Sequence, residues 1–349
     1  MGVWQKIALG CALALVPLVA QAQDKPTLTK VKVGLTRTMI VGATNTAIEK
    51  GYFKEAGLDV DVNYLDGSAS FVVLLARNEL QIVEGGVSAS FFNGVKQGLP
   101  VRIAMDNVST PIGHWMVLRA DLKDKIKTIA DFKGHVLGIN APTSISLYEA
   151  AKVLATGGVS LKDVTVKTVG FPQMVAAFET KAVDAFPMPS PWSTEIPAMG
   201  LGVQWVNIDD VVTPKPFVLS VVMYNTEWAA QNPKVAQGFF TALLRGGRDY
   251  CDAYHGGPNR SEVADRIVRS GVGRDVKALE TYNWGARSVD GKANAASLDD
   301  IQKWYVEQGA LPEAQPMDKV LDTAFADTAA KTLGPFTPAN KDSKKPGCR

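Results

Sequence analysis

The chain has 349 residues, of which 46% are hydrophobic and 21% are charged, which is ordinary globular usage and long enough for two domains. The formal net charge of +2 comes from charges of mixed sign spread along the chain. No stripe of Lys and Arg supplies the counter-charge that a nucleic-acid backbone requires, so nucleic acid is not an expected partner.

The N-terminal segment has the pattern of a secretory signal peptide. An apolar run covers residues 7–20, and Ala20, Gln21 and Ala22 form a cleavage signal before polar residues. The run is too short for a membrane-spanning helix, which needs about 20 apolar residues. Few apolar residues precede Cys11, which argues against a lipid anchor at that cysteine. We therefore expect residues 1–22 to be removed, with cleavage near Ala22, and the product to be periplasmic.

The next part of the chain alternates between strand and helix patterns. Apolar residues at every second position predict strands at 31–35 and 58–64, and a third short strand is expected at 81–83. Helical spacing predicts helices over 44–53 and from Ser68 onward. This order indicates a largely parallel sheet with helices on both faces.

A second series of the same kind follows. Its predicted strands and helices alternate, beginning with a strand, at 136–139, 144–156, 164–169, 173–181 and 183–186. From Glu227 onward the spacing is mostly helical, and the tail after Pro335 is polar. The sequence therefore predicts two α/β lobes and a helical return segment.

A weak internal repeat relates the two series. Residues 74–82 and 176–184 each end a helix with a polar turn and a short apolar strand. These strands then lead into loops of small residues or prolines, at 85–90 and 187–192. Ligands bind beside the carboxyl ends of strands in doubly wound sheets, so the equivalent loops predict a ligand cleft between the lobes.

The segment from Ala47 to Val60 resembles the opening signature of a family of ABC-transporter solute-binding proteins. This is the nitrate, taurine and aliphatic-sulfonate class, which also contains binders of thiamine-pyrimidine precursors. The order of later elements is similar too, at 129–134, at Thr143 and Ser144, and at 182–185. The resemblance covers nearly the whole chain after the signal peptide.

The resemblance implies the type II periplasmic-binding-protein fold, in which two lobes, each a mainly parallel sheet flanked by helices, enclose a ligand cleft. The chain would cross between the lobes near 116–119 and near 222–225. The implied divisions are a first part of lobe 1 at 23–118, lobe 2 at 119–222, the return of lobe 1 at 223–335 and a flexible tail at 336–349.

The resemblance also implies a function and partners. The expected protein is a monomeric component of an ABC importer, which captures a small organic anion by closure of the lobes and then meets the permease and ATPase subunits of the inner membrane. Sulfonates, taurine-like compounds and aromatic carboxylates are the expected ligands, and a neutral pyrimidine precursor or a periplasmic sensing role are alternatives. Gln81 and Ser190 stand where acidic residues are usual in the family, which leaves the ligand class open.

Two pairs of residues are candidates for binding an anion. Arg37 follows the first strand, where its guanidinium could bind a sulfonate or carboxylate beside Thr36, although a solvated loop arginine is the alternative. Thr143 and Ser144 begin a predicted helix, where free N–H groups and the helix dipole favour an anion. Simple N-capping explains this second pair equally well.

Further candidates lie in turns and loops near the predicted cleft. Three of them offer backbone amides with little bulk, and three offer polar or aromatic side chains near a lobe crossing or in the proline-rich loop. The first set is Ser68, Ser88 and Ala89, and the second is His114, Ser190 and Trp192. The alternatives are ordinary turns and packing between the lobes.

Catalytic motifs are not found in the sequence. The three histidines are dispersed, and no G-x-S-x-G, Walker or dinucleotide-binding motif occurs. Cys251 and His255 share a helical face and could supply two zinc ligands, but no third ligand is indicated nearby. Alternatively, Cys251 and Cys348 could form a disulfide in an oxidising compartment. We expect no cofactor, no metal and no enzymatic activity, since the iron-binding cysteine-rich segment of the related thiamine-pyrimidine synthase has no counterpart.

Overall fold

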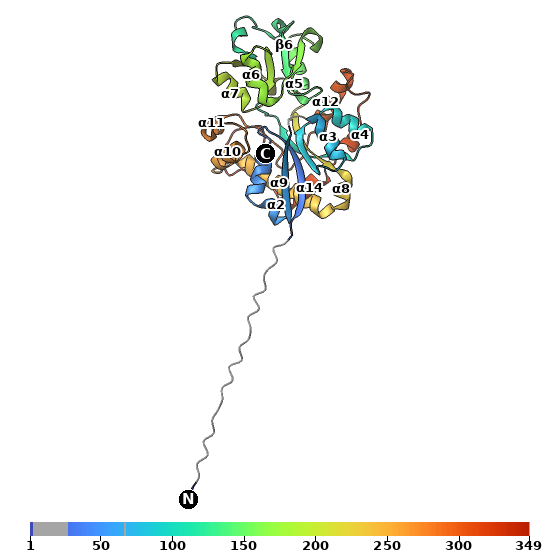
Figure 1. The fold of residues 1–349 in the computed structure, drawn as a ribbon, viewed down its shortest axis with the longest axis vertical. Helices are drawn as coiled ribbons and strands as arrows, with labels where there is room; N and C mark the ends of the chain where they lie inside the picture. The colour runs from blue at the N-terminus through green and yellow to red at the C-terminus, as the bar shows by residue number, and fades with distance from the viewer. Residues whose placement is uncertain (3–26, 66–67, 349) are drawn as a thin grey trace.

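The computed structural model describes residues 1–2, 27–65 and 68–348. The expected signal peptide at 1–22, with its cleavage site and Cys11, falls outside the described residues except for residues 1–2. The rest forms two lobes, each built on a five-stranded sheet with helices packed around it (Figure 1). The two-lobed α/β fold predicted from the sequence is confirmed.

Lobe 1 is built on the sheet with strand order β2-β1-β3-β10-β4. Strand β1 pairs in parallel with both β2 and β3, whereas β10 runs antiparallel to β3 and β4. The strands are β1 (Thr29–Thr36), β2 (Leu58–Leu65), β3 (Ile82–Gly86), β4 (Val101–Ser109) and β10 (Val218–Asn225). Every residue of β10 is buried, as expected for a central strand covered on both faces.

Lobe 2 repeats this arrangement with the order β7-β6-β8-β5-β9. Strand β6 is parallel to β7 and β8, and β5 is antiparallel to β8 and β9. The strands are β5 (Trp115–Arg119), β6 (Val136–Ile139), β7 (Thr165–Thr168), β8 (Ala185–Met188) and β9 (Gly202–Asn207). Each sheet therefore receives one antiparallel strand directly after the chain has come from the other lobe.

The crossings between the lobes lie earlier than the sequence predicted. They are the segments 110–114, between β4 and β5, and 208–217, between β9 and β10. The expected positions at 116–119 and 222–225 fall inside β5 and β10, so the divisions at 118 and 222 shift to these crossings. Strand periodicity shows that a segment is extended, but not which sheet it joins.

Lobe 1 contains most of the helices. Its first part has α1 (Val41–Glu49), α2 (Tyr52–Glu55), α3 (Ser68–Ala76) and α4 (Ala89–Lys96). Its return segment has α8 (Thr226–Gln231), α9 (Pro233–Tyr254), α10 (Arg260–Arg269), α11 (Val276–Thr281), α12 (Ala295–Glu307), α13 (Met317–Val320) and α14 (Ala324–Leu333). The single helix predicted over 44–53 is two helices, because Gly51 adopts a left-handed backbone conformation with φ of 78°.

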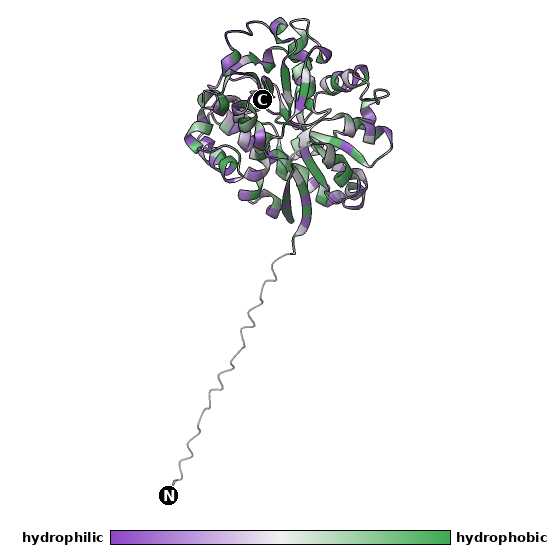
Figure 2. Ribbon diagram, turned by 45° about the horizontal axis from the view of Figure 1, so that its top comes forward, coloured by the Kyte–Doolittle hydropathy of each residue, from purple (hydrophilic) through white to green (hydrophobic). Residues whose placement is uncertain are grey.

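Helix α9 organises the return segment. One face buries Phe239, Phe240, Leu243 and Tyr250, and the other is polar, which is the pattern of a helix packed on a core. Figure 2 shows hydrophobic residues concentrated along the strands and hydrophilic residues toward the periphery. Within the described residues, no helix has both the length and the apolar character that crossing a membrane would take.

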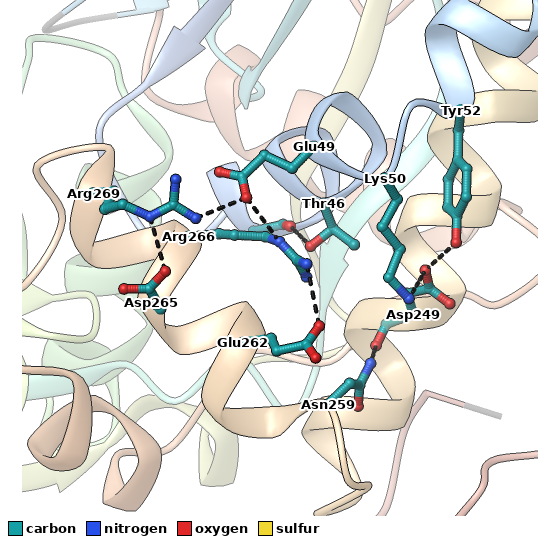
Figure 3. A network of polar contacts seen from close by, with 11 residues as sticks. Thr46, Glu49, Lys50, Tyr52, Asp249, Asn259, Glu262, Asp265, Arg266 and Arg269 are labelled. Atoms are coloured by element: carbon teal, nitrogen blue, oxygen red, sulfur yellow. Dashed lines mark hydrogen bonds and ion pairs between the residues drawn. The ribbon is translucent and has the colours of Figure 1, made fainter.

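Helices α1 and α10 are joined at their surface by ion pairs. The Glu49 carboxylate accepts hydrogen bonds from Nε of Arg266 at 3.1 Å and from Nη2 of Arg269 at 2.7 Å (Figure 3). Because Glu49 is partly exposed, these pairs contribute modestly to stability and mainly orient the two helices.

Three helices cover the sheet of lobe 2. They are α5 (Ile145–Ala155), α6 (Met174–Glu179) and α7 (Trp192–Ala198). Helix α5 begins directly after Ser144, at the position predicted from the sequence, and faces lobe 1. This placement brings its first turn to the space between the lobes.

The C-terminal tail is packed against α9, which corrects the prediction of a flexible segment at 336–349. Cys348 forms a disulfide with Cys251 of α9, with Cα atoms 5.4 Å apart. The Tyr254 hydroxyl donates to the carbonyl of Pro346 at 2.7 Å, and Cys348 is 1% exposed. The polar composition of the tail suggested a loose segment, but the covalent link and these contacts hold it on the helix.

Candidate functional site

A cleft of about 770 Å³, which includes space open to solvent, lies between the lobes. Lobe 1 contributes Thr36, Thr38, Met39, Ile40, Gly86, Val108, Leu219, Ser220, Tyr250 and Gly285. Lobe 2 contributes Asn140, Ser144, Ile145, Ser146, Glu149, Phe171, Pro187, Pro189 and Ser190, and the first crossing adds Ile112 and His114.

The cleft lies where parallel strands end. Thr36 is the last residue of β1, Gly86 is the last of β3, and Asn140 follows β6 directly. The loop after β8 supplies Pro189 and Ser190. This is the edge at which α/β sheets bind ligands, and here two such edges face each other.

A buried acid and base pair spans the first crossing and lobe 2. Nδ1 of His114 lies 2.9 Å from Oε1 of Glu149, and the side chains are 9% and 1% exposed. Among the described residues, Nε2 of His114 has no hydrogen-bond partner. The pair holds the imidazole in a fixed orientation and offers a ring nitrogen and a carboxylate to a ligand in the cleft.

Hydroxyl groups form the polar end of the cleft in lobe 2. The Ser144 and Ser146 hydroxyls are 2.8 Å apart, and Ser146 donates to Oδ1 of Asn140 at 2.5 Å. Ser144 holds the N-cap position of α5, but its side chain does not cap the helix backbone. Oγ of Ser190 is buried and has no partner among the described residues. A buried hydroxyl without a partner costs free energy, which a bound ligand could recover.

The remaining wall is apolar and partly aromatic. Met39, Ile40, Ile112, Ile145 and Leu219 line it. Phe171 lines it too, and its ring is stacked on the indole of Trp192, with ring centroids 5.1 Å apart and planes inclined by 7°. An aliphatic and aromatic wall of this kind suits the apolar body of an organic ligand.

Four of the residues predicted from the sequence line this cleft: Thr36, His114, Ser144 and Ser190. Arg37 does not line it, because its guanidinium lies over the ring of Tyr64, 4.5 Å from the centroid. Trp192 lies behind Phe171 and supports it from outside the lining.

Thr143, Ser88 and Ala89 also lie outside the lining. Backbone N–H of Ala89 donates to the carbonyl of Thr143 at 3.4 Å, which joins the two lobes beside the cleft. Ser88 holds the N-cap position of α4, but its side chain makes no hydrogen bond to the helix backbone. Ser68 begins α3, and its side chain is not described.

Several lining residues were missed by the sequence reasoning. Phe171 follows β7 by three residues, and the rule that ligand sites lie at carboxyl ends of strands could have found it. Glu149 lies one turn into the helix whose start was already a candidate. Ser220 and Tyr250 belong to the return segment, and no local pattern points to them.

The charge of the lining differs from the expected anion site. Among the described residues that line the cleft, none is Lys or Arg, and Glu149 is the one carboxylate. A strongly anionic ligand would therefore depend on hydroxyls, backbone N–H groups and the His114 ring.

A model of the family described as NMT1/THI5 like matches residues 42–253, which is more than half of the chain. The chain belongs to this family. A relative of this NMT1/THI5-like chain is the riboflavin-binding protein RibY of Chloroflexus aurantiacus, with 26% identity over 245 residues, covering 67% of the chain and 66% of RibY. The nitrate/nitrite binding protein NrtA of Nostoc sp. is 30% identical over 133 residues, covering 38% of the chain and 30% of that protein. The chain thus spans less than two thirds of the length of these relatives.

Solved structures share the fold of this family member at low identity. The periplasmic nitrate-binding protein NrtA of Synechocystis matches with a TM-score of 0.75 at 18% identity, covering 93% of both chains. The alkanesulfonate-binding protein SsuA of Xanthomonas axonopodis, bound to MOPS, matches with a TM-score of 0.68 at 16% identity, covering 86% of this chain and all of SsuA. The desulfurization enzyme DSZB also matches, with a TM-score of 0.64 at 17% identity, over 88% of this chain and all of that one. At these identities the likeness shows the periplasmic-binding-protein fold alone.

Proposed function

We propose that the chain is the exported solute-binding component of an ABC importer, which captures a small organic molecule between its lobes. One observation carries the proposal: both lobes supply residues to a single cleft that contains buried hydroxyls, one of them without a partner. Membership of the NMT1/THI5-like family and the binding proteins among its relatives support this function. Ligand would close the lobes, and the closed form would meet the permease and ATPase subunits.

We further propose that the ligand is uncharged or weakly charged rather than strongly anionic. Arg37 was the cationic candidate, but it stacks on Tyr64 outside the lining. The lining offers a carboxylate on Glu149, hydroxyl groups and an apolar wall, which suit a ligand with both donor and acceptor groups on an apolar body. Nitrate lacks such a body, whereas a heteroaromatic compound has one.

The arrangement of His114 supports binding rather than catalysis. Activation of a Ser, Thr or Cys nucleophile by a histidine base needs a hydroxyl or thiol hydrogen-bonded to that base. The described hydrogen bonds of the His114 ring lead to Glu149 and to no hydroxyl or thiol. The enzyme DSZB shares the fold, so catalysis is the alternative function of this chain. An assay for chemical turnover of the bound ligand tests it.

A thermal-shift screen tests the proposed function, because a ligand that binds only the folded state raises the melting temperature. The panel is riboflavin, a hydroxymethylpyrimidine, benzoate, taurine, MOPS and sodium nitrate. We expect a neutral heteroaromatic member to give the largest shift and to reduce the radius of gyration in small-angle scattering. A nitrate or taurine shift larger than all others would overturn the ligand class. Failure of every member to bind would overturn capture of these solutes.

A further inference from the structure

A buried arginine lies beneath the floor of the cleft. Arg287 is 5% exposed, and its guanidinium lies over the ring of Tyr250, 4.1 Å from the centroid. Its Nη1 donates a hydrogen bond of 3.1 Å to Oδ1 of Asn107. Among the described residues, its Nε and Nη2 have no partner. Burying a cation costs free energy. The contacts of Arg287 therefore indicate whether it serves the fold or the site.

Arg287 fixes the orientation of the Asn107 amide. A guanidinium has only donors, so the Asn107 atom that faces it must be the carbonyl oxygen. The amide nitrogen Nδ2 then points the other way, where it donates to Oε2 of Glu84 at 3.2 Å and to Oγ of Ser220 at 3.3 Å. All three residues that Asn107 contacts in this way are buried.

The orientation of Asn107 decides the direction of the Ser220 hydroxyl. Oγ of Ser220 accepts from Asn107, so the hydroxyl hydrogen does not lie on that bond. No other side-chain partner of Ser220 occurs in the described part of the chain, and Ser220 lines the cleft. The free hydrogen is therefore available to a molecule in the cleft.

We propose that Ser220 is a fixed hydrogen-bond donor to the ligand, and that Asn107 and Arg287 are positioning residues that hold it in this role. The inference rests on the proposed function, since it requires that the cleft binds a solute. It implies that the ligand presents an oxygen or nitrogen acceptor toward β10. Ser220 would then bind an acceptor group of the ligand, and the Glu149 carboxylate would bind a donor group.

The alternative is that Arg287 has a purely structural role and does not orient Ser220 through Asn107. Arg287 lies near two buried carboxyl groups, Glu84 and Asp106, whose charges it offsets. In that case Ser220 would be one more buried hydroxyl, and its removal would leave ligand affinity unchanged. The two roles therefore differ in what the Ser220 hydroxyl does for binding.

The experiment measures dissociation constants of riboflavin, MOPS and nitrate, each of which carries an oxygen acceptor. The proteins are the wild type, Ser220→Ala, Asn107→Asp and the control Ser109→Ala. Ser109 is buried in the same layer and donates to Asp106 at 3.2 Å, but it does not line the cleft. For each probe that binds the wild type, we expect Ser220→Ala to weaken binding about tenfold, the loss of one hydrogen bond.

Asn107→Asp tests whether Asn107 sets the direction of the Ser220 hydroxyl. A carboxylate at this position only accepts, so it would draw the Ser220 hydrogen away from the cleft, and we expect the same loss of affinity as in Ser220→Ala. Wild-type affinity in Ser220→Ala would overturn the donor role while leaving the proposed function intact. An equal loss in Ser109→Ala would show general loosening and would also overturn it. A wild type that binds none of these three probes would overturn the donor role, whereas the proposed function would fall only if every member of the thermal-shift panel also failed to bind.

Discussion

Tyr148 of lobe 2 donates a hydrogen bond of 2.5 Å to the carboxylate of Asp300 in lobe 1. The Nζ atom of Lys152, one turn further along α5, lies 2.9 Å from the same Asp300 oxygen. The Tyr148 hydroxyl oxygen also lies 3.2 Å from the carbonyl oxygen of Thr213 in the second crossing. Burial and the bond to Asp300 raise the pKa of Tyr148 well above its ordinary value, so the phenol stays a donor. These contacts hold α5 of lobe 2 against α12 of lobe 1.

Removal of these contacts between the lobes should favour an open form. We expect Asp300→Ala to increase the radius of gyration without ligand and to weaken ligand binding about three- to tenfold, because about 1 kcal/mol of closed-state stabilisation is lost. Asp299→Ala is the matched control, since Asp299 pairs with Lys303 of its own helix at 2.5 Å. Scattering curves of the two variants that coincide would show that the Asp300 contacts do not hold the lobes together.

Two buried carboxyl groups make stability depend on pH. Burial raises the pKa of Glu84 to about 7, against hydrogen bonds from Thr44 and Asn107 and the charge of Arg287, which lower it. Burial likewise raises the pKa of Asp106 to about 7. In the unfolded chain Glu84 loses its proton near its ordinary pKa of 4.5, so between pH 4.5 and 7 the folded state binds more protons. The free energy of unfolding should therefore fall as pH rises through this window.

Glu84→Gln isolates the Glu84 contribution. Each unit by which the pKa is raised corresponds to about 1.4 kcal/mol, so the variant should lose markedly less stability than the wild type between pH 5 and pH 8. Urea unfolding at both pH values measures the difference. Glu79→Gln removes an exposed carboxyl group and should leave the wild-type difference unchanged. Equal pH dependence in Glu84→Gln and the wild type would show that Glu84 is not protonated on folding.

The sequence predicted the parallel parts of both sheets because those parts are encoded locally. The alternation at 31–35 and 58–64 becomes β1 and β2, and 136–139 becomes β6 with the same bounds. The antiparallel strands β5 and β10 join a sheet assembled from distant segments, so periodicity could not assign them to a lobe. This is why the crossings were placed a few residues too late.

The candidate site was predicted only in part, for a similar reason. The rule that ligand sites lie at the carboxyl ends of strands places Thr36 and Ser190 at the cleft edge, where both line it. It does not give the direction in which a side chain points. Arg37 turns to Tyr64, and Trp192 turns to Phe171. The relay from Arg287 to Ser220 joins residues separated by 180 and 113 positions along the chain, and no pattern of spacing reveals such a contact.

The disulfide should stabilise the fold substantially. Cys251 and Cys348 are 97 residues apart, and closing a loop of that length contributes up to about 4 to 5 kcal/mol by restricting the unfolded chain. We expect Cys348→Ser to lower the melting temperature and to expose the tail to limited proteolysis. Dithiothreitol should destabilise the wild type and leave Cys348→Ser unchanged. If dithiothreitol destabilised both proteins equally, reduction of the Cys251–Cys348 disulfide would not be the cause.

The close approach of α9 to α1 depends on Gly246. A Cβ atom there would lie 2.5 Å from the carbonyl oxygen of Ala43 and 2.7 Å from Cβ of Ala47, and the first of these is backbone that cannot turn aside. Gly246→Ala should therefore push the helices apart and reduce the free energy of unfolding by about 1 to 3 kcal/mol. Gly238→Ala, on the same helix, is the control, because its Cβ would meet Ala56 at an ordinary 3.4 Å. The control should be neutral or slightly stabilising, since alanine favours a helix by about 1 kcal/mol over glycine. Urea unfolding of both variants measures the contrast, and equal stability would mean that α1 and α9 can separate at little cost.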